Sequence, residues 1–492
     1  MPLLDQRTLR RTHRTIALDV NLLRRPSVSL ILLLADGVRP DTLARAIDAG
    51  VLPALARLRA DGGLFSVTSV FPSVTGPAYT PFLLGRHPGA VGLPGIRWYD
   101  RSHRRAGWPS FARSYVGPDL RHVDADLDPG APTVFELAQP SIGALSVITR
   151  GLPRAAVIGG GPRFAARAAL THLRGRSDAW LGIDRSIADV AVCRIRAERP
   201  RFAFVAFTGV DKAAHAAGHD SPAALEALRL VDETAARVRE DAERDGRWEA
   251  THLWVASDHG HSPVRAHDDL AGLLRAAGHR VLAHPMVFTR DPDVAVMVSG
   301  NAMAHLYLDP GRRLRPWWSA LRGRWEPLAS ILLDRESVDL LLLPIDDRHT
   351  EVRGRGRGSA MVERIGRRLS YRPISGDPLA LGELAPLDTG ESLEATRDSD
   401  YPDALVQIAS MAACARSGDI ILSAARGWDF RARFEPIPHV SSHGGLHREH
   451  MLVPLLVNRR PVRTPERTVD TFATAAAVLS FEAGVAEGKS FL

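Results

Sequence analysis

Acidic and imidazole residues directly follow apolar, strand-like runs at widely separated places in this chain. Residues 30–35 lead into Asp36, residues 202–207 stop just before Asp211, and residues 252–257 lead into Asp258. In an open parallel sheet the carboxyl ends of all strands share one edge, where ligands bind. Carboxylates gathered at that edge would repel one another unless a cation held them together. The sequence therefore predicts a metal site at the edge of a parallel sheet.

Strand-like and helix-like segments alternate along the N-terminal half of the chain. The expected strands are residues 27–35, 64–70, 202–207 and 252–257, and the expected helices are residues 40–49, 52–60, 187–198 and 223–240. This alternation is typical of a doubly wound α/β fold, in which helices flank both faces of a mostly parallel sheet. A chain of 492 residues, 45% of them hydrophobic, can form such a core together with an insertion.

Two stretches interrupt the alternation. Residues 97–128, rich in Arg, Asp, Gly and Pro, are expected to form a loop or cap near the site, and strand-like pieces between charged turns indicate an inserted α+β subdomain. The predicted parts are a basic N-terminal segment (1–26), a catalytic core (27–308) containing the cap, the inserted subdomain (309–429) and a C-terminal return to the core (430–492).

Composition argues against several classes of protein. The two cysteines, Cys193 and Cys414, are far apart and form no CxxC pair, so a disulfide framework or a thiolate zinc site is not expected. No apolar run approaches the roughly 18 residues of a membrane span, and residues 1–26 lack the apolar stretch of an export signal. We therefore expect a cytoplasmic protein without a membrane span.

The net charge of +7 does not by itself indicate a nucleic-acid partner. Arginine carries nearly all of the positive charge, because Lys212 and Lys489 are the only lysines. A short Arg-Gly run at residues 353–358 resembles an RNA-binding tract, although a single copy is more often a turn between strands. We expect no nucleic-acid partner, while a positive field can still attract a small anionic substrate.

Thr75 is the candidate nucleophile. It lies in a turn after a strand, and residues 77–84 are expected to form a helix that begins with Pro77. A hydroxyl there lies beside free backbone N–H groups, where a phosphate oxygen would be stabilised. Threonine is a weak nucleophile at its free pKa, so a metal would have to activate it. Taken alone, capping of the helix is the favoured interpretation of Thr75.

Further residues have the spacing of metal ligands. Asp211 and His215 are one helical turn apart, so both can face one cation. Asp258 and His259 are adjacent in a turn, and His443 lies in a turn of small residues before a further strand. Each motif alone is weak evidence, but their combination, mostly at strand ends, favours metal binding.

The order of these motifs resembles the alkaline phosphatase superfamily, in particular its type I phosphodiesterase/nucleotide pyrophosphatase branch. About half of the chain carries the resemblance, at residues 29–268 and 439–458. The matching motifs are Leu34-Ala-Asp-Gly37, Thr75 before a helix, a loose glycine and proline match at residues 85–92, Asp211-x-x-x-His215, Asp258-His259-Gly260 and Ser442-His443-Gly444.

The resemblance implies two zinc ions, which Mn²⁺ could replace. The implied ligands are Asp36, Asp258, His259 and the Thr75 hydroxyl for one ion, and Asp211, His215 and His443 for the other. Thr75 would attack phosphorus and form a phospho-threonine, which water then cleaves, while the ions clamp the attacking and leaving oxygens. The expected activity is hydrolysis of small phosphate esters, with phosphodiesters first.

Departures from the family pattern leave the substrate open. The nucleophile motif often continues as Phe-Pro-Asn-His but here reads Gly76-Pro-Ala-Tyr79, and nucleotide-cleaving members usually carry an Asn at the position that Ile96 occupies. Lys212 could contact the phosphoryl group as a point charge instead. Three nearby histidines are expected to lie outside the ligand sets: His219, His447 and His450.

Other activities fit the sequence less well. Thr75 lacks the C/S-x-P-x-R context of sulfatases, no G-x-S-x-G elbow is present, and residues 484–490 have too few residues between their glycines for a phosphate-binding loop. The remaining alternatives are a phosphomonoesterase or phosphonate hydrolase on the same core and, in a different class, a non-catalytic protein that binds a phosphorylated metabolite.

Overall fold

The computed structural model describes residues 27–102, 112–285, 288–430, 437 and 439–492. The predicted N-terminal segment (1–26) therefore lies outside the described residues. The same holds for parts of the predicted cap and of the C-terminal return, at residues 103–111, 431–436 and 438.

One part of the protein is built on a seven-stranded sheet with the order β2-β21-β8-β1-β7-β5-β6. Its strands are β1 (Ser29–Ala35), β2 (Gly63–Thr68), β5 (Ser141–Ala144), β6 (Val157–Ile158), β7 (Phe202–Phe207), β8 (Thr251–Ala256) and β21 (Leu452–Val457). The strands from β8 to β6 pair in parallel, and β21 runs antiparallel to both of its neighbours. The prediction of a mostly parallel sheet is confirmed.

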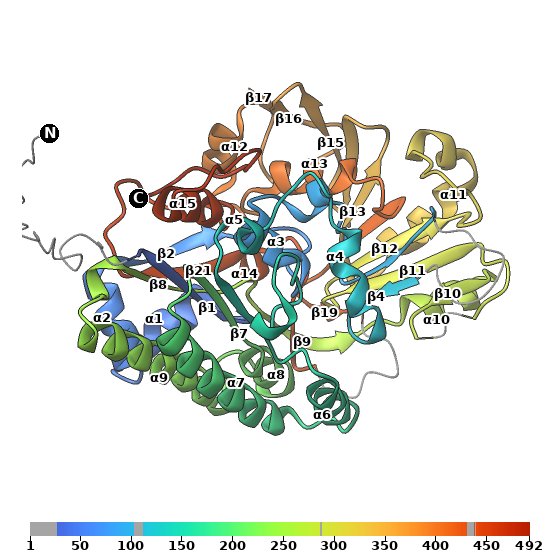
Figure 1. The fold of residues 1–492 in the computed structure, drawn as a ribbon. Coiled ribbons are helices and arrows are strands. Elements are labelled where there is room, and N and C mark those ends of the chain that lie inside the picture. Colours follow the sequence, from blue (N-terminus) through green and yellow to red (C-terminus); the bar gives the residue numbers. More distant parts are fainter. Residues whose placement is uncertain (1–26, 103–111, 286–287, 431–436, 438) are drawn as a thin grey trace, which may run out of the picture.

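Helices cover both faces of this sheet (Figure 1). They are α1 (Pro40–Asp48), α2 (Pro53–Asp61), α7 (Ser177–Glu198) and α9 (Pro222–Arg244) on one face, and α3 (Thr80–Leu84), α5 (Val134–Leu137) and α15 (Asp470–Leu479) on the other. Within β1, Leu32 packs into the cluster under α3 and α15, whereas its neighbour Leu33 packs under α1 and α9. Because both faces are buried, the strand is apolar throughout.

A second, nine-stranded sheet has the order β10-β11-β12-β18-β13-β14-β15-β16-β17. Its strands are β10 (Val281–Ala283), β11 (Val294–Ser299), β12 (Met303–Leu308), β13 (Val338–Pro344), β14 (His349–Gly354), β15 (Gly358–Ile365), β16 (Arg368–Pro373), β17 (Leu384–Leu387) and β18 (Ile420–Ala424). All pairs except β10–β11 are antiparallel. The sheet thus begins before the boundary predicted at residue 309, because β12 pairs with β18.

Helices also cover both faces of the nine-stranded sheet. α10 (Leu270–Ala276) and α11 (Trp318–Leu333) pack on one face, and α13 (Ala404–Ala413) packs on the other. The Arg-Gly run at residues 353–358 forms the turn between β14 and β15, as the single-copy interpretation expected.

The described part of the predicted cap lies against the second sheet. It contains β3 (Arg97–Tyr99) and β4 (Ala112–Ser114), which pair with each other, and α4 (Val123–Asp126). The buried Arg101 reaches from this region to the second sheet, where Nη2 donates to Leu308 O at 2.9 Å and pairs with Asp419 Oδ2 at 2.5 Å. The cap and the insertion are therefore joined by a buried ion pair.

A small three-stranded sheet, β19-β9-β20, connects distant segments of the chain. Its strands are β9 (Ser262–His267), β19 (Gly427–Asp429) and β20 (Ser441–Ser442). In the antiparallel β9–β20 pair, Ser442 lies opposite Ser262. Because β9 begins shortly after His259 and β20 ends directly before His443, this pairing brings the late motif beside the early one.

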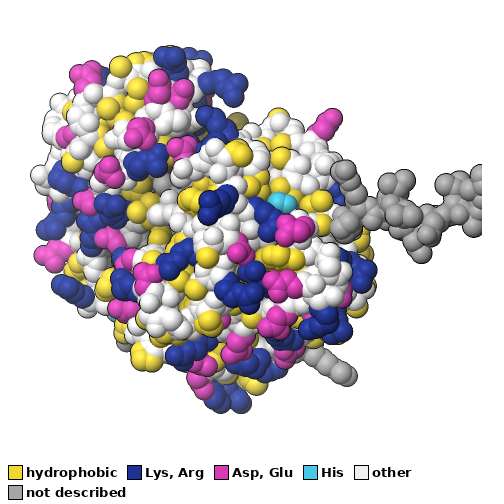
Figure 2. All heavy atoms as spheres, turned by 90° about the vertical axis from the view of Figure 1, so that its left-hand side faces the viewer, with side chains coloured by type: hydrophobic (Ala, Val, Ile, Leu, Met, Phe, Trp, Pro, Cys, Tyr) yellow, Lys and Arg dark blue, Asp and Glu magenta, His cyan; other side chains and the backbone are white. Residues whose placement is uncertain are grey.

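The surface shows charges of both signs. In the view of Figure 2, basic and acidic side chains are interspersed rather than gathered into one large patch. Among the described residues, no helix combines the length and the apolar character that crossing a bilayer requires. The cytoplasmic location and the absence of a nucleic-acid partner stay predictions.

Candidate metal centre

The strand-end residues meet at the carboxyl edge of the seven-stranded sheet. Asp36 follows β1, and Asp258 and His259 follow β8. Shortly after β7 begins α8 (Gly209–Ala217), which carries both Asp211 and His215. The structure therefore brings together, from three neighbouring parallel strands, the residues that the sequence placed at their ends.

The Thr75 hydroxyl points to these residues and caps no helix. The expected helix at residues 77–84 is divided into a 3₁₀ turn, η2 (Pro77–Tyr79), and α3, and the turn has no side-chain cap. Thr75 Oγ1 lies 3.2 Å from both carboxylate oxygens of Asp36 and 3.3 Å from Nε2 of His259. Asp36 and His259 are buried, whereas Thr75 is half-buried. Thr75 is thus the accessible member of this group.

Asp36, Asp258 and His259 form one candidate ligand group. His259 Nε2 lies 3.1 Å from Asp36 Oδ1 and 3.5 Å from Asp258 Oδ2. Two ligands of a tetrahedral zinc ion are separated by about 3.3 Å, so these spacings suit a shared cation. Asp258 Oδ2 is buried and accepts no hydrogen bond from any described residue. Such an oxygen is unfavourable unless a cation pairs with it.

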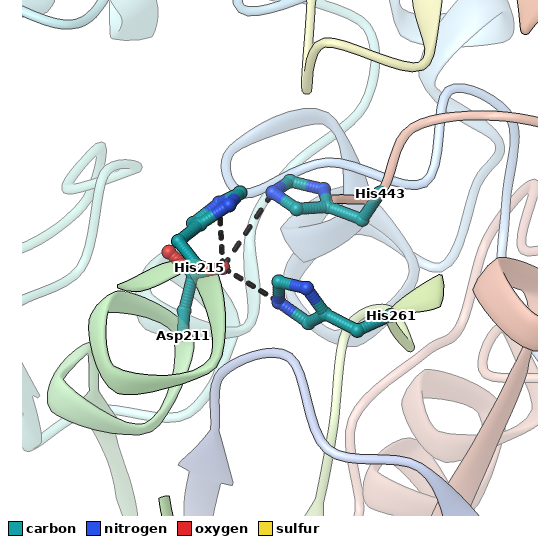
Figure 3. Close-up of side chains that lie close together, drawn as sticks. All are labelled: Asp211, His215, His261 and His443. Atoms are coloured by element: carbon teal, nitrogen blue, oxygen red, sulfur yellow. Dashed lines mark hydrogen bonds and ion pairs between the residues drawn. The ribbon is translucent and has the colours of Figure 1, made fainter. Parts of the chain in front are cut away.

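A second group surrounds Asp211 (Figure 3). Asp211 Oδ1 lies 3.3 Å from Nε2 of His215 and 3.5 Å from Nε2 of His443. His261, which is not among the predicted ligands, places Nε2 3.0 Å from the same oxygen. One ligand atom from each of these four residues lies within 4.8 Å of the others. His261 follows His259 by two residues in the sequence, but this spacing alone does not indicate that its ring faces Asp211.

Backbone carbonyl groups orient three of the imidazoles. The Nδ1 atoms of His215 and His443 donate to Ser441 O and Ser73 O, each at 2.9 Å, and Nδ1 of His259 donates to Gly260 O at 3.2 Å. In the neutral form of each ring, this bond leaves the lone pair of Nε2 free. Metal-bound histidines are held in this way, through the nitrogen that does not bind the metal.

Burial and charge shift the pKa values in the site. Burial, with the Asp36 carboxylate, raises the pKa of Asp258 well above its usual range. Burial lowers the pKa of His443 well below its usual range and that of His261 to about 3, so both rings are neutral. Burial also opposes ionisation of Asp211, but His215 and Lys212 hold its pKa well below the usual range. Burial opposes protonation of His259, but the carboxylates of Asp258 and Asp36 raise its pKa to about 9. Carboxylates crowded among imidazoles suit a bound cation.

The predicted substrate contact, Lys212, lies next to the ligands. Its Nζ is 2.7 Å from Asp211 Oδ2, the oxygen that does not face the three histidines. The Lys212 side chain is 25% exposed. Its contact with a substrate stays a prediction.

The other histidines make different contacts. His219 Nδ1 lies 3.2 Å from Thr42 Oγ1, His447 Nε2 donates to Ala424 O, and His450 Nε2 lies 2.7 Å from Ser262 Oγ. Within the described part of the chain, none of the three belongs to either ligand group. The ring of His439, also absent from the predicted set, stacks on His215 with centroids 4.3 Å apart.

The fold and the family define a hydrolase of the alkaline-phosphatase type, and the buried cluster of Asp and His side chains at its sheet edge is of the kind that can hold a metal ion. The type I phosphodiesterase/nucleotide pyrophosphatase family matches residues 30–446, and the chain belongs to this family. The resemblance stated from the motifs is confirmed. The prediction of an enzyme that acts on phosphoric ester bonds is confirmed with it.

Solved structures share the fold. Phosphonoacetate hydrolase from Sinorhizobium meliloti 1021, in complex with phosphonoformate, aligns with a TM-score of 0.56 and 18% identity over 92% of this chain and 96% of its own. Murine ectonucleotide pyrophosphatase/phosphodiesterase 5, as an inactive variant in complex with AMP, aligns with a TM-score of 0.55 and 14% identity over 94% and 97%. At these identities the likeness shows the fold alone. Among curated proteins we found no match for the chain.

Proposed function

We propose that this protein hydrolyses phosphate esters, with phosphodiesters as the first candidates, through a phospho-threonine formed on Thr75. The observation that carries the proposal is the position of the half-buried Thr75 hydroxyl. It lies 3.2 Å from Asp36 and 3.3 Å from His259, beside a buried group of carboxylates and imidazoles. A nucleophile placed beside cation ligands is the arrangement that phosphoryl transfer through an activated hydroxyl requires.

The proposed centre holds two divalent cations. The proposed ligands are Asp36, Asp258, His259 and Thr75 for one cation, and Asp211, His215 and His443 for the other. When bound, the cations would lower the pKa of the attacking hydroxyl and neutralise charge on the phosphoryl oxygens. Oxygen and nitrogen ligands suit Zn²⁺ first and also Mn²⁺.

The residues of the chain would act in two steps. Thr75 Oγ1 loses its proton and bonds to phosphorus, while the bond between phosphorus and the leaving oxygen breaks and that oxygen takes up a proton to depart as the alcohol. Water then attacks the phospho-threonine, restores the Thr75 hydroxyl and releases the phosphate monoester. The Asp36 carboxylate, 3.2 Å from Oγ1, orients the hydroxyl beforehand, and Lys212 is close enough to the ligands to contact a phosphoryl oxygen.

Hydrolysis of a phosphonate is the second candidate. The apolar side chain of Ile96 packs against the core and has no hydrogen-bonding group at the position where nucleotide-cleaving members usually carry an Asn. Phosphonoacetate hydrolase is also among the similar solved structures. In this reaction Thr75 would attack phosphorus in the same way, and the bond between phosphorus and carbon would break, with a proton taken up by the carbon.

One panel of substrates tests these alternatives. Protein reconstituted with Zn²⁺ or Mn²⁺ is assayed with bis-p-nitrophenyl phosphate, p-nitrophenyl phosphate and phosphonoacetate, each with and without a chelator. We expect the diester to react fastest and turnover to stop on chelation. Turnover of phosphonoacetate alone would favour the second candidate, and turnover of the monoester alone would favour a phosphomonoesterase.

A further inference from the structure

Three imidazoles surround the Asp211 carboxylate almost equivalently (Figure 3). The ring centroids of His215, His261 and His443 are separated by 4.9, 5.0 and 5.1 Å. Their Nε2 atoms lie 3.3, 3.0 and 3.5 Å from Asp211 Oδ1. His261 is thus closer to this oxygen than either predicted histidine ligand, and all three rings direct the same atom to one point.

Ser441 holds two of these rings with two different groups. Its carbonyl oxygen accepts from Nδ1 of His215 at 2.9 Å, and its hydroxyl oxygen lies 2.8 Å from Nδ1 of His261. When Nδ1–H of His261 donates to this hydroxyl, Nε2 keeps a free lone pair. His261 then has the same form as the predicted ligands His215 and His443.

The His261 ring is also confined. It has no exposed surface, and Gly37 lies against it. A Cβ atom added at Gly37 would be 2.7 Å from His261 Nε2, so a larger residue would displace the ring. A side chain that packing already holds in position can bind a metal without further ordering.

We propose that His261 is a fourth protein ligand of the cation held by Asp211, His215 and His443. The inference rests on the proposed function in one respect, namely that a cation binds there. Four protein ligands fill the tetrahedral sphere of zinc, whereas catalytic zinc sites commonly use three and keep one position open. Water or a substrate oxygen would therefore join this cation only as a fifth ligand.

The same distances also fit a merely orienting role, in which Nε2–H of His261 donates to Asp211 Oδ1. The two roles differ in the number of imidazoles bound to the metal. Affinity alone does not separate them, because removing an orienting partner also weakens metal binding, by about 10–100-fold. Coordination number and histidine count do separate them.

The test uses metal-free full-length protein titrated with Co²⁺, whose visible absorption reports coordination number. We compare the wild type with His261→Gln, in which an amide can still donate to Asp211 but no imidazole is present. We expect two bound Co²⁺ ions in the wild type. In His261→Gln, one of the two ions should bind at least tenfold more weakly. The visible absorption bands of this ion should be weaker and shifted, and added inorganic phosphate should then change them.

Ser441→Ala is the matched control, because it removes the hydroxyl beside His261 but keeps the carbonyl that holds His215. It should weaken binding of the same ion by less than His261→Gln does. Unchanged bands in His261→Gln, with two ions still bound, would overturn the ligand role of His261. A wild type that binds no Co²⁺ would instead overturn the proposed metal centre.

X-ray absorption by the cobalt-loaded wild type gives an answer even if His261→Gln does not fold. The scattering from imidazole rings in this spectrum gives the total number of histidines bound to the two ions. Four histidines (His215, His259, His261 and His443) support the proposal. Three would overturn it.

Discussion

The two large sheets of this protein differ in where their strands end. In the seven-stranded sheet, the parallel strands β1, β7 and β8 all deliver their following residues to one edge, where Asp36, α8 and Asp258 lie. In the nine-stranded sheet, neighbouring antiparallel strands end at opposite edges. Parallel pairing therefore gathers the residues that follow the strands at one edge of the sheet, whereas antiparallel pairing places them at both edges.

The nine-stranded sheet nevertheless helps to place one ligand. At the β11–β12 turn, Ala302 N donates to His443 O at 2.9 Å, and Ser442 Oγ donates to Gly300 O at 3.1 Å. This turn holds the backbone of His443, while no strand of the sheet supplies a member of either ligand group in the described part of the chain. The first sheet positions most of the candidate ligands, and the second sheet supports the backbone of one of them.

The largest effect that this comparison predicts is on activity, at Thr75. Thr75→Ala should lower kcat/KM by about 10³-fold or more, about 4 kcal/mol of transition-state stabilisation, because it removes the nucleophile. Metal content, measured by mass spectrometry, should be retained. Thr75→Ser, which keeps a hydroxyl, should keep part of the turnover. Wild-type turnover by Thr75→Ala would exclude the nucleophile assignment.

Replacing one fully buried leucine in each sheet compares how the two cores affect stability and metal binding. Leu342 in β13 and Leu33 in β1 are both fully buried, so replacing either with Ala should lower the free energy of unfolding by about 2–5 kcal/mol in urea titrations. Only Leu33→Ala should also weaken metal binding, because β1 leads directly into Asp36. Equal loss of metal affinity in both variants would mean that the two sheets do not differ in this respect.

A pH effect is expected from the second sheet. His305 in β12 is fully buried, with Nε2 donating to Pro94 O at 2.9 Å and Nδ1 accepting from Gly418 N at 3.1 Å. Burial lowers its pKa to about 4. The unfolded chain therefore binds a proton more readily, and the stabilisation is present above about pH 6.5 and is lost as the pH falls towards 4.

Between pH 7 and pH 5 this single residue should account for about 2 kcal/mol of lost stability. Urea unfolding of the metal-free protein at both pH values measures it, and His305→Gln is the reference that cannot titrate. The wild type should lose more stability than His305→Gln over this interval. Equal losses would show that His305 does not titrate in this way.

The smallest effect is expected at an exposed ion pair between helices α7 and α9, which cover the seven-stranded sheet. Arg185 and Glu233 lie 3.1 Å apart, and their side chains are 49% and 51% exposed. Arg185→Ala should change the unfolding free energy by about 1 kcal/mol or less and leave turnover unchanged, because solvent and salt screen the pair. A larger loss of stability would show that the helix layer depends on this contact.

Much of the fold could be predicted because a buried parallel strand is apolar along its whole length. The strand expected at residues 202–207 has the same bounds as β7. Short strands such as β5 and β6 carry too few residues to show a pattern. The strands at residues 281–308 resemble core strands, and only their pairing with β18 assigns them to the second sheet.

Two kinds of candidate ligand could be predicted from the sequence. One kind directly follows a strand, as Asp36 follows β1, and the other kind is a pair one helical turn apart, as Asp211 and His215 are on α8. His261 could not be selected in this way, because the spacing in Asp258-His259-Gly260-His261 does not say which ring turns towards Asp211. The β9–β20 pairing decides this by placing Ser441 beside both His215 and His261. Long-range contacts of this kind leave no local pattern in the sequence.

The most direct test of the account is anomalous diffraction at the zinc edge from crystals of the zinc-loaded protein. We expect two peaks about 4 Å apart. One should lie among Asp36, Asp258 and His259 beside the Thr75 hydroxyl, and the other should lie among Asp211, His215 and His443. A map without a peak between these side chains, or with zinc bound only elsewhere on the protein, would contradict it.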